Sequence, residues 1–560
     1  MFKIIVAFIT LVKISPRAFI NYWLGSFNKL GYLSEIIAAE KMVYESVRKN
    51  SGKAGENVIA FVSFLPLPFC FKMEGLMSIA LKRKGCHTVV FSNLASHRFV
   101  REFHKKIYGN EIVLLESFLR PTLVESVESD IDRMLSVKTG LISQLKMYKY
   151  RDANIGLHVL ATLSTDIVHG KVEVNIESLR RIRRMLIRSA HYVDAADRAL
   201  KEIKPKLVIG VERGFVGTSE IFYASLNNNV KYMQWVASHE PNSLMMKKYD
   251  WSNFRMHPFS LSKKTWEHVK EIEWSSEDAC NLKSKFEQGY KDGVWFKQKF
   301  LDLIGNHKHK ARSDLVSDLK LDSNLKIAVI YSHILSDANL FYGEDIFESG
   351  FEEWMIETIK AAEQCKDVNW ILKIHPANIY RNAKSGYVGE YGELLSIKNH
   401  FDKVPDFLKI VYPDDPISPL SFFQGTDYAI TVRGTIGIEA PVYGVTTLTA
   451  GSGRYSDLGF TIDSNSKEEY LQRIRKLNDV PTIDADSIRL AQIFASTLFN
   501  ARPTRYGNIF KDSFPRAVNH PGHRDLKFLK DDLEDALIDV QVQDLVKFIE
   551  SDEEDFLKEV

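Results

Sequence analysis

Short apolar runs separated by amphipathic stretches dominate the first part of the chain, beginning with NVIAFVSF at 57–64 and HTVVFS at 87–92. Between them, residues 72–84 place apolar side chains at helical spacing, and Gly85 ends that stretch. A strand, a helix and a second strand in this order are typical of the first unit of a parallel sheet. The region 108–203 predicts mainly helices.

The alternation returns in two later stretches. Strand patterns occur at 206–211 and 230–237, and a new series starts with LKIAVIYS at 325–332. That series continues with further strand candidates at 369–376, 407–413, 428–432 and 446–450. Since parallel strands need crossover connections, the pattern predicts an α/β fold. We expect two doubly wound, Rossmann-like domains that face each other across a cleft.

The stretch from about 260 to 312 is polar and strongly charged, which favours a connection between the two domains. The final part is mostly helical and ends in an acidic tail. The predicted parts are an N-terminal helical segment at 1–50, an α/β domain with a helical insertion at 51–312, a second α/β domain at 313–483 and a C-terminal helical segment at 484–560.

Composition excludes some classes of function. The chain has 560 residues with 74 basic and 72 acidic side chains, so it lacks the basic excess of a nucleic-acid-binding protein. Its four cysteines show no metal-ligand spacing. We therefore expect no metal and no nucleic-acid partner, and a reducing, cytoplasmic location.

The N-terminus allows two interpretations. The apolar run IIVAFITLV at 4–12 is too short to span a bilayer, and the amphipathic sequence AFINYWLGSF follows it. One interpretation is a helix packed on the fold. The other is an interfacial helix that holds the protein peripherally at the inner membrane.

The sequence TVRGTIGIEAPVYG indicates an anion site at the end of a strand. Gly434 lets the backbone approach a ligand, and amides at the start of the following helix attract anions. Thr431 and Thr435 add hydroxyl groups, and Arg433 adds a guanidinium suited to phosphate. Glu439 follows one turn later, where it could accept hydrogen bonds from a ribose. The alternative is an ordinary helix start with Glu439 in a salt bridge.

A histidine ends another predicted strand in LKIHPAN. Pro376 stops the strand, which places His375 at the mouth of the cleft, where it could bind and neutralise a leaving phosphate. Lys373 lies two residues earlier and faces the same side of a regular strand. The alternative is a capping histidine without a ligand.

Three loops of the second half carry further candidates. Asp337 lies in SHILSDANLFYGEDIF, where it could orient a substrate. Arg454 and Tyr455 lie in the glycine-rich TAGSGRYSDLGF, which suits a loop that closes on sugar or phosphate. The backbone near Ser418 in YPDDPIS could edge a nucleobase, and we interpret the adjacent aspartates as a turn.

In the first half, GVERGFVGTSE places Glu212 at the end of a strand. Its carboxylate could deprotonate an acceptor hydroxyl, or it could pair with Arg213. His239 is the competing base. The run LRRIRRMLIR at 179–188 carries five arginines, which form either a solvated face or a lipid-facing surface.

The span from about 325 to 475 resembles the capsule polysaccharide biosynthesis family, whose members include GT-B-fold, Kdo-transferase-like glycosyltransferases. The resemblance rests on the order and spacing of SDANLFYGEDIFESGFEEWMIETI, KIHPAN, YPDDPISP and RGTIGIEAPVYGVTTLTAGSGRYSDLGFTID. The resemblance implies that His375 contacts the donor phosphate. It also implies that Thr431 and Thr435 correspond to the family's hydroxyl residues at the phosphate turn, Glu439 to its helix glutamate and Asp337 to its loop aspartate. The chain departs from several relatives at Asn378, where they carry an acid, and at the Arg-Gly-Thr turn, where serine is common.

These observations predict a metal-independent glycosyltransferase of GT-B-like fold that needs no cofactor besides its nucleotide-sugar donor. The expected acceptor is a growing surface polysaccharide or a lipid-linked sugar. Glu212, Asp337 and His375 are the predicted catalytic residues. The alternatives are a nucleotide-sugar epimerase of the same architecture and a non-catalytic scaffold of a polysaccharide assembly complex.

Overall fold

The computed structural model describes most of the chain after residue 56. The described residues are 57–65, 68–94, 98–120, 124–137, 140–165, 167, 172–240, 242–292, 308–335, 337, 339–379, 382, 387–506, 510–513, 525–528 and 536–558. The predicted N-terminal segment at 1–50 lies outside them. Within these ranges, no helix is both long and apolar enough to cross a membrane.

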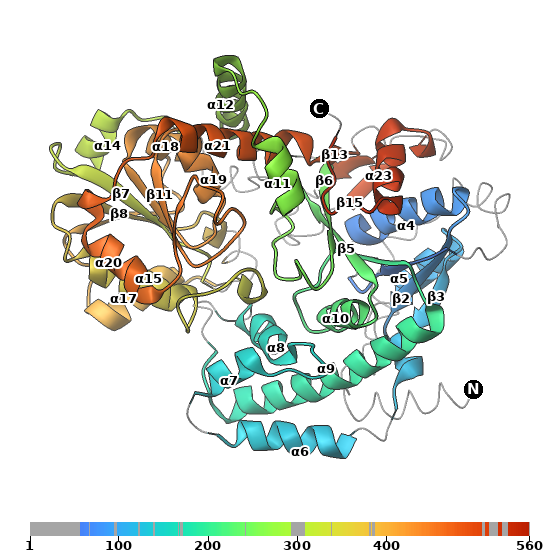
Figure 1. Ribbon diagram of the computed structural model, residues 1–560. Helices are drawn as coiled ribbons and strands as arrows, with labels where there is room; N and C mark the ends of the chain where they lie inside the picture. The colour runs from blue at the N-terminus through green and yellow to red at the C-terminus, as the bar shows by residue number, and fades with distance from the viewer. Residues whose placement is uncertain are drawn as a thin grey trace.

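The first domain is built on a seven-stranded sheet with the order β13-β6-β5-β4-β1-β2-β3 (Figure 1). Strands β1 to β5 are parallel, while β6 and β13 run antiparallel to their neighbours. The strands are β1 Val58–Val62, β2 His87–Ser92, β3 Glu111–Leu114, β4 Leu207–Gly210, β5 Lys231–Ala237, β6 Ser243–Tyr249 and β13 Thr504–Arg505.

Helices cover both faces of this sheet because alternate strand residues point to opposite sides. In β1, Ile59 and Phe61 join a core with α4, α5 and α23, whereas Ala60 and Val62 join a core with α6, α8, α9 and α10. The helices are α4 Pro68–Arg83, α5 Arg98–Lys106, α6 Val124–Leu135, α7 Leu141–Met147, α8 Ile155–Ser164, α9 Ile176–Ile203, α10 Ser219–Asn227 and α23 Val540–Glu550.

The second domain repeats this plan on a six-stranded sheet in which every strand is parallel. The order is β12-β11-β10-β7-β8-β9. The strands are β7 Lys326–Tyr331, β8 Val368–Lys373, β9 Leu408–Val411, β10 Tyr428–Thr431, β11 Thr446–Ala450 and β12 Ile462–Ser464. The helices are α14 Arg312–Asp318, α15 Phe351–Ala362, α17 Gly392–Phe401, α18 Pro419–Gly425, α19 Ile436–Val442 and α20 Lys467–Arg475.

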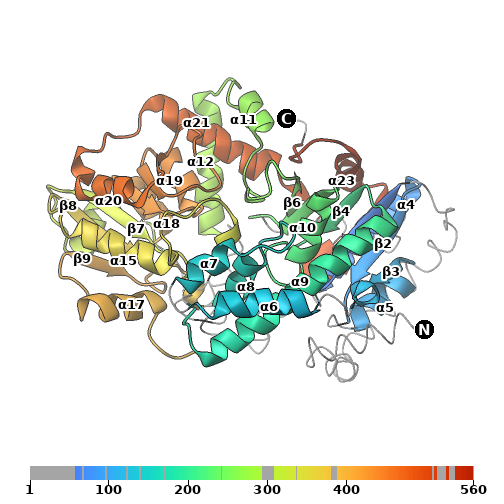
Figure 2. The same ribbon diagram turned by 60° about the horizontal axis from the view of Figure 1, so that its bottom comes forward.

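Both sheets therefore have the doubly wound strand order, in which the chain winds first to one side of the initial strand and then to the other. The predicted α/β class with two Rossmann-like domains in a GT-B-like arrangement is confirmed. Figure 2 shows the helical layers of the two domains side by side.

Four strands of the two sheets, β3, β6, β12 and the two-residue β13, escaped the sequence pattern. β3 has only four residues, and β12 only three. β6 has the sequence SLMMKKY. Its two adjacent lysines break the apolar pattern expected of a buried strand, although every residue in it is buried. Tertiary partners explain the burial, because both lysines bind groups from the C-terminal end of the chain.

Two segments connect the domains. Helices α11 Lys263–Val269 and α12 Ser276–Lys291 belong to the predicted connection, and both contact α21 Ala485–Ser496 in the core of the second domain. After α21 the chain returns to the first domain, where β13 pairs with β6 and α23 packs on α4 (Figure 1). The C-terminal segment therefore contributes to both domains.

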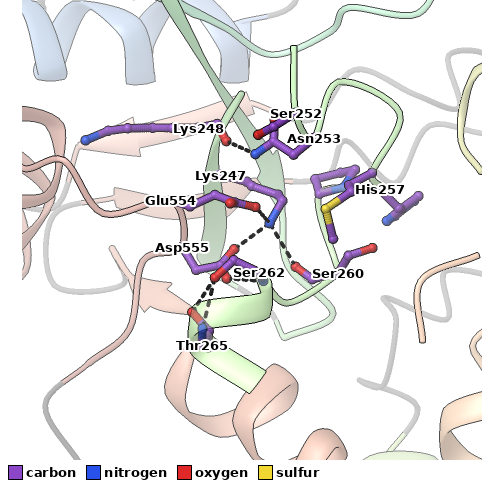
Figure 3. Close-up of polar contacts among 12 residues, drawn as sticks. Lys247, Lys248, Ser252, Asn253, His257, Ser260, Ser262, Thr265, Glu554 and Asp555 are labelled. Carbon is purple, nitrogen blue, oxygen red and sulfur yellow. Dashed lines mark hydrogen bonds and ion pairs between the residues drawn. The ribbon is translucent and has the colours of Figure 1, made fainter. Parts of the chain in front are cut away.

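A buried ionic cluster holds the end of the chain on β6 (Figure 3). The fully buried Lys247 binds the Asp555 carboxylate at 2.8 Å and also pairs with Glu554. Asp555 accepts the Ser262 amide at 2.6 Å and lies 3.4 Å from the buried Arg502 guanidinium. The charges of Lys247 and Arg502 outweigh the desolvation of Asp555, so the pKa of this carboxyl lies well below its usual range.

We predict that Asp555→Asn lowers the free energy of unfolding by about 3 kcal/mol at pH 7, since it leaves two buried cations without their shared carboxylate. A depressed folded-state pKa stabilises the fold above the unfolded value of about 4, and that contribution disappears as pH falls. Urea denaturation should therefore separate the variant from the wild type at pH 7, and the gap should begin to narrow only below about pH 4. The exposed Asp552→Asn should change stability by under about 0.5 kcal/mol, and an equal effect of the two variants would contradict the prediction.

Candidate functional site

The candidate site lies where the strand order of the second sheet reverses. β7 and β10 are neighbours there, and the crossovers that leave them run in opposite directions. Ligands of open α/β sheets bind beyond the carboxyl ends of such strands. The chain segments that begin at Ser332, Ile374 and Val432, after β7, β8 and β10, therefore define the site.

His333, which the sequence analysis missed, organises the turn after β10. Its Nε2 atom accepts the amide of Val432 at 3.1 Å and lies 3.1 Å from the Thr431 hydroxyl. The Gly434 amide in turn donates to Thr431 Oγ1 at 3.3 Å. Burial and the nearby Arg433 hold the pKa of His333 well below its usual range, so the ring is neutral and can accept these bonds. The position of His333 directly after a strand was the available signal.

These contacts correct the prediction that the amides of the turn are open to an anion. Three elements of the turn, the Val432 and Gly434 amides and the Thr431 hydroxyl, are already bonded internally. The turn still reaches the surface at Gly434 and Thr435, which are partly exposed. These two residues, rather than the whole turn, are therefore accessible to a ligand.

Tyr455 supports the same turn from the protein interior. Its hydroxyl donates to the Gly434 carbonyl at 2.7 Å, and its ring is buried. A Cβ atom at Gly437 would lie 1.9 Å from that hydroxyl, so glycine is required there. Tyr455 was predicted to close on a ligand, but the structure uses it as an internal support.

Two other predicted ligand contacts also have protein partners. The Arg433 guanidinium is buried and binds the Asp345 carboxylate and the Tyr342 carbonyl. The Glu439 carboxylate is buried as well and accepts the hydroxyl of Tyr290 at 2.8 Å. Arg433 thus anchors the loop after β7, and Glu439 connects α19 to α12. The expected contacts of these side chains with phosphate and ribose find no support in this arrangement.

His375 is held by a hydrogen-bonded chain. Its amide donates to Ser332 Oγ at 2.9 Å, and Ser332 donates to the buried Glu393 at 2.8 Å. Asn378 donates to the same carboxylate at 2.8 Å, which gives this departure from the family pattern a structural role. The ring Nδ1 accepts the Ala377 amide at 3.1 Å, so the proton of the neutral ring lies on Nε2.

Lys373 and Ser418 flank this strand end on the side of α18. The buried Lys373 ammonium lies 5.4 Å from the centroid of the Phe422 ring, and burial lowers its pKa to about 8. Ser418 is also buried, and its amide donates to the Lys308 carbonyl at 3.0 Å. The backbone near Ser418 is thus paired with residue 308, which leaves it less available to a nucleobase than predicted.

Glu212 of the first domain and Asp337 of the second lie on segments that pack against each other. Glu212 follows β4 at the switch point of the first sheet, and its Oε1 accepts the amides of Arg213 at 2.7 Å and Gly214 at 2.9 Å. Burial is the main cause of its raised pKa, and the negative charge of Asp337 adds to it. Asp337 also acts on the half-buried Arg454, whose pKa is lowered mainly by burial.

The loop after β7 packs on the turn that carries Glu212. A Cβ atom at Gly214 would lie 1.7 Å from the Phe341 ring, so the loop packs directly on the Glu212 turn. The Tyr342 ring lies beneath the Arg213 guanidinium at 4.9 Å, and Gly343 donates its amide to the Arg255 carbonyl at 3.0 Å. This packing places the loop that carries Asp337 against the turn that carries Glu212.

The remaining candidates have structural partners. His239 is buried with its ring centroid 4.6 Å from that of Phe499. In the arginine-rich start of α9, Arg183 binds Asp132 at 2.6 Å and Glu128 at 3.0 Å. The described part of the chain contains no group of three or more metal-ligating His, Cys, Asp or Glu side chains.

Comparison with known proteins gives only distant likenesses. No protein-family description and no curated protein sequence matches the chain. Among solved structures it is similar to KpsC, a β-Kdo 2,4 transferase of Thermosulfurimonas dismutans, with 11% identity, 60% of this chain and 87% of that chain covered, and a TM-score of 0.33.

Two further similar structures have other activities in their names. One is a UDP-GlcNAc 2-epimerase of Neisseria meningitidis bound to UDP-GlcNAc, with 12% identity, 78% and 96% coverage and a TM-score of 0.24. The other is the calicheamicin glycosyltransferase CalG4, with 14% identity, 79% and 94% coverage and a TM-score of 0.26. Likenesses at this level do not identify the reaction.

We predict that Ser332→Ala destabilises the protein by about 1–3 kcal/mol, because the His375 amide loses its acceptor and the buried Glu393 loses a donor. Urea denaturation measures this loss. The matched substitution Ser317→Ala lies on an exposed face of α14 and should change stability by less than about 0.5 kcal/mol. Equal stabilities of the two variants would show that the chain through Ser332 contributes nothing.

Proposed function

We propose that this protein is a glycosyltransferase that moves a sugar from a nucleotide-sugar to an acceptor hydroxyl at the interface of its two domains. The observation that carries the proposal is the packing of the loop with Asp337 on the turn with Glu212, one from each domain, beside the switch points of two doubly wound sheets. Carboxylates supply a base for the acceptor, and the neighbouring strand ends supply cationic and donor groups for a phosphate.

The nucleotide is proposed to bind on the second domain. The Nε2–H of His375 and the guanidinium of Arg454 can donate to phosphate oxygens, and Lys373 adds positive charge deeper along β8. The partly exposed Gly434 and Thr435 border the same strand ends. With these groups the leaving phosphate is stabilised by protein donors, and we propose a metal-independent reaction.

In the transfer step the acceptor oxygen forms a bond to the anomeric carbon, while the bond from that carbon to the phosphate oxygen breaks. The nucleotide leaves with the bonding electron pair, and the hydroxyl proton passes to a carboxylate. Glu212 is our candidate for this base, because its raised pKa brings it closer to neutral pH and two backbone amides fix its orientation. Asp337 then orients the acceptor from the opposite domain.

The acceptor is proposed to be a growing surface polysaccharide or a lipid-linked sugar, as the resemblance to the capsule family implies. A cytoplasmic enzyme at the inner surface of the membrane would meet both. These two parts of the proposal rest on the sequence motifs, and their direct test is transfer to isolated membrane fractions with a labelled donor.

An epimerase of the same architecture is the second candidate, since two carboxylates near one sugar could remove and return a proton. Incubation of the full chain with a nucleotide-sugar and no acceptor separates the two. Release of a new nucleotide-sugar under those conditions would sink the transferase proposal and favour the epimerase. Absence of binding to every nucleotide tested would favour a scaffold.

We predict that a panel of CMP, CDP, UDP, GDP and dTDP contains at least one nucleotide that raises the melting temperature, because binding to the folded state stabilises it. His375→Ala should abolish that shift, since it removes the Nε2 donor. The control is His309→Ala, an exposed histidine bonded to Gln424. A shift that survives in His375→Ala would remove this residue from the nucleotide site.

We predict that Glu212→Gln lowers kcat by about 10²–10⁴-fold, the usual contribution of a general base, with the nucleotide-induced shift unchanged. A base acts when ionised, and the pKa of Glu212 is raised, so the wild-type rate should rise with pH through a value above about 4.3. Measurement of kcat against pH for both proteins tests this. An unchanged kcat would show that Glu212 is not the base, and Asp337 would become the candidate.

A further inference from the structure

An interdomain cavity of about 90 Å³ is lined by Asp337 and by residues of both domains. Its first-domain wall comes from α7 and α8, and its second-domain wall from the segment after β7 and the start of α15. Asp337 and Asp345 are among its lining residues. Since Asp345 binds Arg433, which follows β10, the cavity lies next to the strand ends where the nucleotide is proposed to bind.

The lining of the cavity combines acidic and apolar side chains. Four of the lining side chains are acidic and one is basic, and that lysine, Lys146, donates to the Glu348 carbonyl. The acid Glu352 is fixed by the Ser396 hydroxyl at 2.7 Å. Apolar side chains from both domains line the cavity as well, among them Ile142 and Leu160 from the first and Phe351 from the second. A ligand here meets both hydrogen-bond acceptors and nonpolar surface.

We infer that this cavity is the acceptor subsite and that it takes a neutral sugar rather than a sugar acid. A neutral pyranose offers hydroxyl donors to the carboxylates and a C–H face to the apolar side chains. A sugar carboxylate or phosphate would place a negative charge among Asp337, Glu348 and Glu352, which costs free energy in a partly buried site. The inference rests on the proposed function for the statement that the bound sugar is the acceptor.

Two matched ligands test the charge preference. Methyl β-D-glucopyranoside and methyl β-D-glucuronide differ only at C6, where the second carries a carboxylate. Saturation-transfer NMR on the full chain at pH 7 should detect the neutral glycoside, with the glucuronide binding at least about tenfold more weakly. Equal or tighter binding of the glucuronide would overturn the inference.

Two variants of α7 test the location. Ile142→Trp fills the cavity and should abolish the glycoside signal, while Met147→Trp changes an exposed residue outside the lining and should keep it. Ile142→Phe replaces the first variant if its melting temperature shows that it does not fold. Glycoside binding that persists in a folded Ile142 variant would place the sugar elsewhere. Nucleotide-induced shifts in melting temperature, measured on the same samples, separate the two proposals. If no nucleotide shifts the wild type, the proposed donor site is wrong, while the measured preference for a neutral sugar still stands.

Discussion

The packing of Phe341 against Gly214 is the contact on which the interdomain site depends. A side chain at residue 214 would displace the ring, so glycine permits the loop after β7 to lie directly on the turn after β4. Glu212 lies two residues before this contact, and Asp337 lies four residues before Phe341. The contact therefore holds the loop with Asp337 against the turn with Glu212, and a side chain at residue 214 would disturb segments of both domains.

Several buried charges are compensated by groups that lie close to them. Arg433 is neutralised by Asp345, Lys247 by Asp555, and the Glu393 carboxylate accepts two neutral donors. Each arrangement positions a segment that is distant along the chain, because an unpaired charge in the interior is costly. Arg433 shows the consequence for function. A guanidinium expected to hold phosphate instead anchors the loop that carries Asp337, and our proposal assigns anion binding to His375 and Arg454.

The two connections between the domains converge on the same part of the first sheet. The chain leaves the sheet after β6 and returns to it as β13, and the final residues then pair with β6 itself. The acidic end of the chain thus has a structural role that its composition alone did not suggest. Because Asp555 contacts both Lys247 and Arg502, it joins the outgoing strand to the returning one.

Much of the fold followed from the sequence, because apolar strands such as β1, β7 and β10 form where hydrophobic runs alternate with amphipathic helices. The same rule placed Glu212 and His375 at strand ends, since the carboxyl ends of parallel strands meet at one edge. It failed for β6, whose lysines are buried only because carboxylates and carbonyls from the far end of the chain reach them. It also failed to separate ligand-binding groups from internal ones. Arg433, Glu439 and Tyr455 have the chemistry of a nucleotide site, but their partners lie on other loops and helices, and only the tertiary structure decides which groups are already bonded.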